Sequence, residues 1–124
     1  MSYIVAPFEV SAQALAEPLK VRFVHLYPAI ATRHSDTIDC VFRVGEQQVY
    51  GERVEGKRAT VSISCAALTE LREKEHLYLN DQQLAEIAAL DLRRTLQQGY
   101  DATEAELYID GVQLRALGRE LGYL

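Results

Sequence analysis

The clearest hydrophobic pattern in the chain runs from Asn80 to Gly99 and predicts a long helix. Its interior is rich in Ala, Leu, Glu, Gln and Arg, which favour helix. Asn80 or Asp81 can cap the first turn, and Gly99 readily takes the left-handed conformation that ends a helix. At about 100° per residue, one broad face of this helix is apolar and is expected to pack against a sheet. That face consists of Leu84, Ala85, Ala88, Ala89, Leu92 and Leu96.

Two apolar residues of the same helix, Ile87 and Leu90, fall outside this face, on a flank shared with Asp91 and Arg94. A sheet alone would leave both partly exposed. Either the N-terminal segment or the C-terminal helix covers them, or they belong to a subunit interface. Arginine is enriched at interfaces. We therefore predict a homodimer that uses Ile87, Leu90 and Arg94, with intrachain cover as the competing explanation.

The region from Leu19 to Ile63 alternates between apolar and polar positions, as strands do. Leu19–Tyr27 predicts one strand, and the polar stretch that begins at Ala29 predicts a surface loop. Three further strands follow, joined by short turns that contain glycine: Ile38–Val44, Gln47–Val54 and Ala59–Ile63. Consecutive strands with such turns indicate an antiparallel meander.

Helical patterns take over at Ser64, which is placed to cap a helix from Cys65 to about Lys74. Asp110 with Gln113 fits a capping box that opens a last helix. Weaker patterns predict a short helix over residues 11–17 and a strand over residues 106–109.

The change from period two to period 3.6 predicts an α+β fold: a small antiparallel meander sheet packed against a long amphipathic helix, with shorter flanking helices. The 124 residues fit one domain, 1–124, which is large enough to bury a core without disulfides or a metal. The expected core includes Phe42, Val61, Ile63, Leu84, Leu92 and Leu96.

Charge and hydropathy narrow the classes of partner. The net charge of -5 argues against nucleic acid, because that affinity depends on clustered Lys and Arg. No apolar run approaches the roughly 20 residues that span a bilayer, so we expect no membrane partner. The N-terminus lacks a basic region, and Pro7 and Glu9 interrupt its apolar residues, so we expect a cytoplasmic protein with reduced cysteines.

The densest polar cluster holds four potential metal ligands within seven positions: His34, Asp36, Asp39 and Cys40. Zinc sites usually show two separate pairs of ligands, and no second pair exists here. In a strand, Asp39 and Cys40 would also point to opposite faces. We therefore expect a solvated loop and no metal.

Cys65, at a predicted helix N-terminus, is the one candidate nucleophile, since the helix dipole favours a thiolate. No motif supplies the base that a nucleophile needs, so no catalytic residue is assigned. The glycines form no phosphate-binding run, and we expect no cofactor.

The leading hypothesis for function is a non-catalytic module that binds another protein or itself. One alternative is a small enzyme with a site at His34, Asp36 and Asp39, with Cys65 nearby; another is an acidic inhibitor of a basic effector protein. A concave pocket converging on those residues would favour the enzyme, and a flat apolar patch the binding module. Seven tyrosines suit both core margins and protein interfaces, and we expect most of them at core margins.

Overall fold

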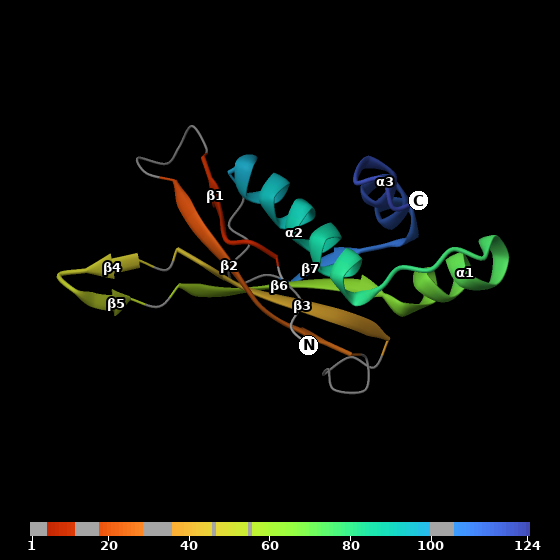
Figure 1. The fold of residues 1–124 in the computed structure, drawn as a ribbon, viewed down its shortest axis with the longest axis horizontal. Coiled ribbons are helices and arrows are strands. Elements are labelled where there is room, and N and C mark those ends of the chain that lie inside the picture. Colours follow the sequence, from red (N-terminus) through yellow and green to blue (C-terminus); the bar gives the residue numbers. More distant parts are fainter. Residues whose placement is uncertain (1–4, 12–17, 29–35, 46, 55, 100–105) are drawn as a thin grey trace.

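The computed structural model describes the chain except for residues 1–4, 12–17, 29–35, 46, 55 and 100–105. Five strands form one mixed sheet in the order β1-β2-β3-β6-β7, and β4 and β5 form a separate hairpin (Figure 1). The α+β class is therefore confirmed. The elements in chain order are β1 (Phe8–Val10), β2 (Leu19–Tyr27), β3 (Thr37–Val44), β4 (Gln47–Val49), β5 (Glu52–Val54), β6 (Lys57–Ser64), α1 (Cys65–Glu75), α2 (Asp81–Gln97), β7 (Glu106–Ile109) and α3 (Gly111–Glu120).

The predicted antiparallel meander is wrong in two respects. The segment expected to form one strand, Gln47–Val54, reverses at Tyr50 and Gly51 and pairs with itself, so β3 pairs directly with β6. Both turn residues have positive φ, 55° and 79°, as a two-residue type I′ turn requires. In addition, β7 joins the sheet parallel to β6, which makes the sheet mixed.

The long helix is confirmed as α2, and its start is held by a reciprocal cap. The Asn80 side chain accepts a hydrogen bond from the Gln83 amide, and the Gln83 side chain accepts one from the Asn80 amide. Every residue of the predicted apolar face is buried. The helix lies across one face of the sheet, and Gly99, with φ of 85°, follows its end (Figure 1).

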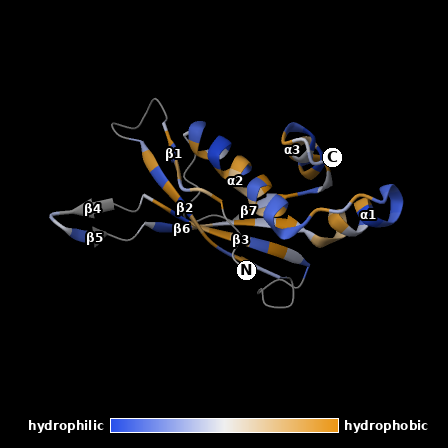
Figure 2. Ribbon diagram, viewed as in Figure 1, coloured by the Kyte–Doolittle hydropathy of each residue, from blue (hydrophilic) through white to orange (hydrophobic). Residues whose placement is uncertain are grey.

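The core lies between α2 and the sheet, where the apolar positions of both elements meet (Figure 2). All six predicted core residues are buried. The rings of Phe23 and Phe42 on neighbouring strands make an edge contact, with centroids 5.4 Å apart. Ile109 and Leu114 bring β7 and α3 into the same core.

The two shorter predicted helices are also confirmed. Ser64 caps α1 by accepting a hydrogen bond from the Ala67 amide at 3.2 Å. Asp110 and Gln113 form the expected capping box at the start of α3. The helix expected over residues 11–17 lies outside the described residues.

Ile87 was expected to be partly exposed on a lone sheet, and instead its side chain is fully buried at 0% exposure. It belongs to one buried cluster with Leu114 and Leu117 of α3, and α3 packs beside α2. Leu90 is half-buried against the same core. Cover within the chain therefore accounts for Ile87 without a partner subunit.

Candidate functional site

The structure places three of the four residues of the alternative enzyme site close together, at the junction of β3, β6 and α1. The Cys65 amide, in the first turn of α1, donates a hydrogen bond to the Asp36 carbonyl at 2.9 Å. Asp39 lies on β3, where its carboxylate accepts a hydrogen bond from the Thr37 hydroxyl at 2.9 Å. His34 lies outside the described residues. Their proximity follows from the β3–β6 pairing, since Thr37 lies opposite Ser64.

A cavity of about 230 Å³ opens beside Cys65, between α1, the link that follows it and the start of α2. Five leucines and Ile38 form the apolar part of its lining, and Cys65, Thr69, Arg72, Tyr78 and Asp81 form a polar part of similar extent. Neither Asp36 nor Asp39 lines it. The cavity therefore converges on one residue of the predicted cluster, not on the cluster as a whole.

The chemistry of Cys65 does not match an activated nucleophile. Burial raises the pKa of its thiol, and the carboxylates of Asp36 and Asp39 raise it further. These effects oppose the thiolate that a helix N-terminus favours. Cys40, buried beneath α2, is held more firmly as a thiol, because burial and the nearby Asp39 and Asp81 raise its pKa to about 12. Both cysteines are free thiols.

Other features of a catalytic or metal site are missing around this cavity. No histidine lines it, and Asp81 is its single carboxylate. Across the described parts of the chain, no group of three His, Cys, Asp or Glu side chains is arranged to hold a metal ion. His76, at the end of α1, is exposed with a left-handed backbone, φ 56°. These observations describe a hollow of mixed polar and apolar lining, with a thiol whose pKa is raised.

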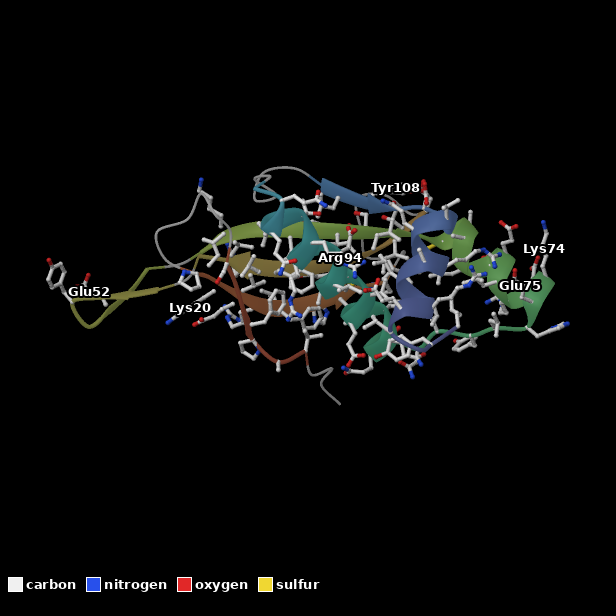
Figure 3. The ribbon with its side chains drawn as sticks, turned by 90° about the horizontal axis from the view of Figure 1, so that it is seen from above. Lys20, Glu52, Lys74, Glu75, Arg94 and Tyr108 are labelled. Atoms are coloured by element: carbon white, nitrogen blue, oxygen red, sulfur yellow. The ribbon has the colours of Figure 1, made fainter. Side chains whose placement is uncertain are left out.

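The predicted interface flank offers less surface than its sequence suggested. Ile87 is buried and Leu90 is half-buried. Arg94 is exposed on α2 (Figure 3). It forms an ion pair with Glu120 of α3, which also raises the pKa of Arg94. Leu90 and Arg94 are what this flank presents to another molecule.

The feature that sequence reasoning missed is a projecting arm formed by β4 and β5. This hairpin pairs with no strand of the main sheet and extends beyond the rest of the chain (Figure 1). Glu52 marks its outer end, opposite the end that holds Lys74 and Glu75 (Figure 3). Tyr50, in the turn at the tip, is fully exposed, at 102%. A tyrosine followed by glycine inside an otherwise polar strand pattern is the signal that could have indicated the turn.

No protein-family model, curated protein or solved structure matches this chain. Among the described helices, none combines the length and apolar character needed to cross a bilayer.

Proposed function

We propose that this protein is a non-catalytic binding module whose β4–β5 arm contacts another protein. The observation that carries the proposal is the position of Tyr50, a large aromatic side chain fully exposed at the tip of a projecting hairpin. Tyrosine is among the residues that most often dominate protein interfaces, because its ring buries a large area and its hydroxyl can bond at the rim.

The energetics of the free chain favour this interpretation. A two-stranded hairpin outside a larger sheet is marginally stable in water. Tyr50 adds a left-handed backbone, φ 55°, at a position that suits Asn, Asp or Gly, and such strain costs of order 1–3 kcal/mol. Its ring gains no burial in return within the chain. A partner that buries the ring would offset the strain and order the arm.

The enzyme alternative has weaker support. The cavity beside Cys65 has the size for a small ligand, but the raised pKa keeps the thiol protonated near neutral pH. A thiol without a neighbouring base is a poor nucleophile.

Site-specific photocrosslinking tests the proposal. Tyr50 is replaced by a benzophenone amino acid in cells that produce the protein, and covalent adducts are identified by mass spectrometry. The matched control places the same group at Tyr78, another exposed tyrosine, which lies between α1 and α2 and beside the cavity. We expect one recurrent protein adduct from position 50. An adduct of twice the chain mass would identify a second copy as the partner.

Binding of that partner is then measured with purified variants. Tyr50→Ala should weaken it by about tenfold or more, as loss of an interface hot spot does, while Tyr78→Ala leaves it unchanged. Absence of an adduct at position 50, or equal binding by wild type and Tyr50→Ala, would overturn the proposal. Adducts at position 78 alone would instead favour a site at the cavity.

A further inference from the structure

Three arginines lie side by side on neighbouring strands of the sheet, at the end nearest the arm. Arg22 of β2 pairs in register with Arg43 of β3, and Arg43 pairs with Arg58 of β6. Neighbouring strands are about 4.8 Å apart, so the row spans about 10 Å. Arg22 and Arg58 are exposed and Arg43 is half-buried. We call these three residues the arginine row.

Two residues of the row, Arg43 and Arg58, carry positive charge that no carboxylate in the described part of the chain balances. Like charges directly opposite one another destabilise a sheet. The ion pairs within the described residues join Lys74 to Glu70, Arg94 to Glu120 and Arg115 to Glu75. Arg22 has an interaction of its own, whereas Arg43 and Arg58 have no carboxylate partner in the described part of the chain.

Arg43 is held in place without being neutralised. One of its guanidinium nitrogens donates to the Gly56 carbonyl at 3.2 Å. A guanidinium has five N–H donors in a planar fork, so most of them are left for another acceptor. The hydrogen bond fixes the direction of the fork at the point where the chain returns from the arm to β6.

The arginine row lies at the root of the projecting arm. β3 ends at Val44 and β6 begins at Lys57, and the arm occupies the residues between them. The Gly45 amide donates to the Lys20 carbonyl at 2.8 Å, which ties the start of the arm to β2. Strand alternation directs the arginines away from Phe42 and Ala59, the neighbouring positions packed in the core beneath α2. The row therefore lies on the face opposite α2, next to the two ends of the arm.

We infer that the arginine row binds an acidic segment of the protein that the arm contacts. Guanidinium groups bind carboxylates with paired, charge-assisted hydrogen bonds. Arg43 and Arg58 lie opposite each other on neighbouring strands, about 5 Å apart, so one or two carboxylates of a short acidic segment can reach both guanidinium groups. The inference rests on the proposed function and adds to it the chemistry of the partner.

Charge also decides between an acidic protein segment and a nucleic acid. Nucleic acids bind tightly through roughly six to ten phosphate contacts, far more than Arg43 and Arg58 can supply. The net charge of -5 opposes a long polyanion, whereas a short segment with a few carboxylates feels mainly the local positive charge. Because this face is positively charged, it gives no support to the alternative that the protein uses it as an acidic inhibitor of a basic effector protein.

A labelled eight-residue glutamate peptide is the probe, and its glutamine analogue is the control ligand, with binding followed by fluorescence anisotropy. Arg58→Glu reverses the charge at one position of the row, and Arg119→Glu makes the same charge change at an exposed position of α3. We expect wild type to prefer the glutamate peptide. Arg58→Glu should weaken that binding by about tenfold, the loss of one charge-assisted contact, and Arg119→Glu by less than about twofold.

Weaker peptide binding by Arg58→Glu would not result from unfolding. The variant places a carboxylate opposite Arg43, so its melting temperature should be unchanged or higher. Equal weakening by both variants would show a general charge effect and overturn the inference. So would equal binding of the two peptides, or tighter binding of a labelled oligothymidylate than of the glutamate peptide.

The experiments distinguish failure of the proposed arm interface from failure of the proposed acidic-segment site at the arginine row. If Arg58→Glu keeps the crosslinked partner bound while Tyr50→Ala loses it, the arm is the interface and the arginine row is not part of it. If the glutamate peptide depends on Arg58 but position 50 yields no protein adduct, the row binds anions and the proposed function is wrong.

Discussion

Ser62 and Ser64 lie two positions apart on β6 and are both buried, but they differ in their hydrogen bonds. The Ser64 hydroxyl caps α1, whereas the Ser62 hydroxyl oxygen has no partner within the described structure. We predict that Ser64→Ala lowers the free energy of unfolding by about 1 kcal/mol, the cost of a lost helix cap. Ser62→Ala should be neutral or stabilising, because it removes an unsatisfied buried group. Urea denaturation of both variants checks this, and a larger loss for Ser62→Ala would contradict it.

The packing of α2 gives a second matched pair. Leu92 is fully buried against the sheet, and Gln97 is exposed at the end of the same helix. Leu92→Ala should cost roughly 2–5 kcal/mol of unfolding free energy, and Gln97→Ala less than about 0.5 kcal/mol. Thermal and urea unfolding provide the measurement. Equal melting temperatures would mean that α2 does not pack as described.

The homodimer predicted from the sequence is tested with the variant Leu90→Asp. Because Ile87 is covered within the chain and Arg94 is paired with Glu120, we expect Leu90→Asp to destabilise the fold by about 1–3 kcal/mol without changing the mass in solution. Sedimentation equilibrium of wild type and variant measures that mass. A wild-type dimer that becomes a folded monomer in Leu90→Asp would support the two-fold interface instead.

The buried thiol of Cys40 should make the free energy of unfolding fall as pH becomes alkaline. Its pKa is raised to about 12, so the folded chain keeps the proton that the unfolded chain loses. The stabilisation is fully present below the ordinary thiol pKa and is lost as pH rises toward 12, by roughly 1.4 kcal/mol per unit for one group. We predict that Cys40→Ala has a shallower fall in unfolding free energy between pH 9 and pH 10 than wild type. Parallel slopes would show that Cys40 does not contribute.

Tyr50 should show opposite effects on stability and on binding. Asn suits the left-handed turn position better than Tyr, so Tyr50→Asn should increase protection of the arm amides in hydrogen exchange. The same variant should lose the partner found by crosslinking, because the exposed ring is gone. If it binds the partner as tightly as wild type, the ring is not the contact, even if the arm is.

Local signals in the sequence predicted most of the helices, and pairing between distant segments explains what was missed. Asn80 with Gln83, and Asp110 with Gln113, act within one turn, so their caps could be expected from spacing alone. The reversal at Tyr50 and Gly51 was missed because an alternating pattern does not distinguish one strand from two short ones. The parallel pairing of β7 with β6 joins residues more than 40 positions apart.

In the candidate site, too, local features could be predicted from the sequence and those that depend on strand pairing could not. Cys65 at the start of α1 was predicted, but the raised pKa of its thiol depends on burial and on two carboxylates that the β3–β6 register brings near. The arginine row is a property of that register as well. Arg22, Arg43 and Arg58 are far apart in the sequence, and a shift of one residue in either pairing would turn part of the row toward the core.

The parallel pairing of β7 beside β6 has a consequence for synthesis on the ribosome. During translation, β1 to β6 and both α1 and α2 are complete before residues 106–124 emerge. Until then, β6 is an open edge, and the core lacks Ile109, Leu114 and Leu117. An exposed edge strand beside uncovered leucines is a template for intermolecular pairing. Nascent chains that pause before residue 106 should therefore depend on chaperones, and released chains that end there should aggregate.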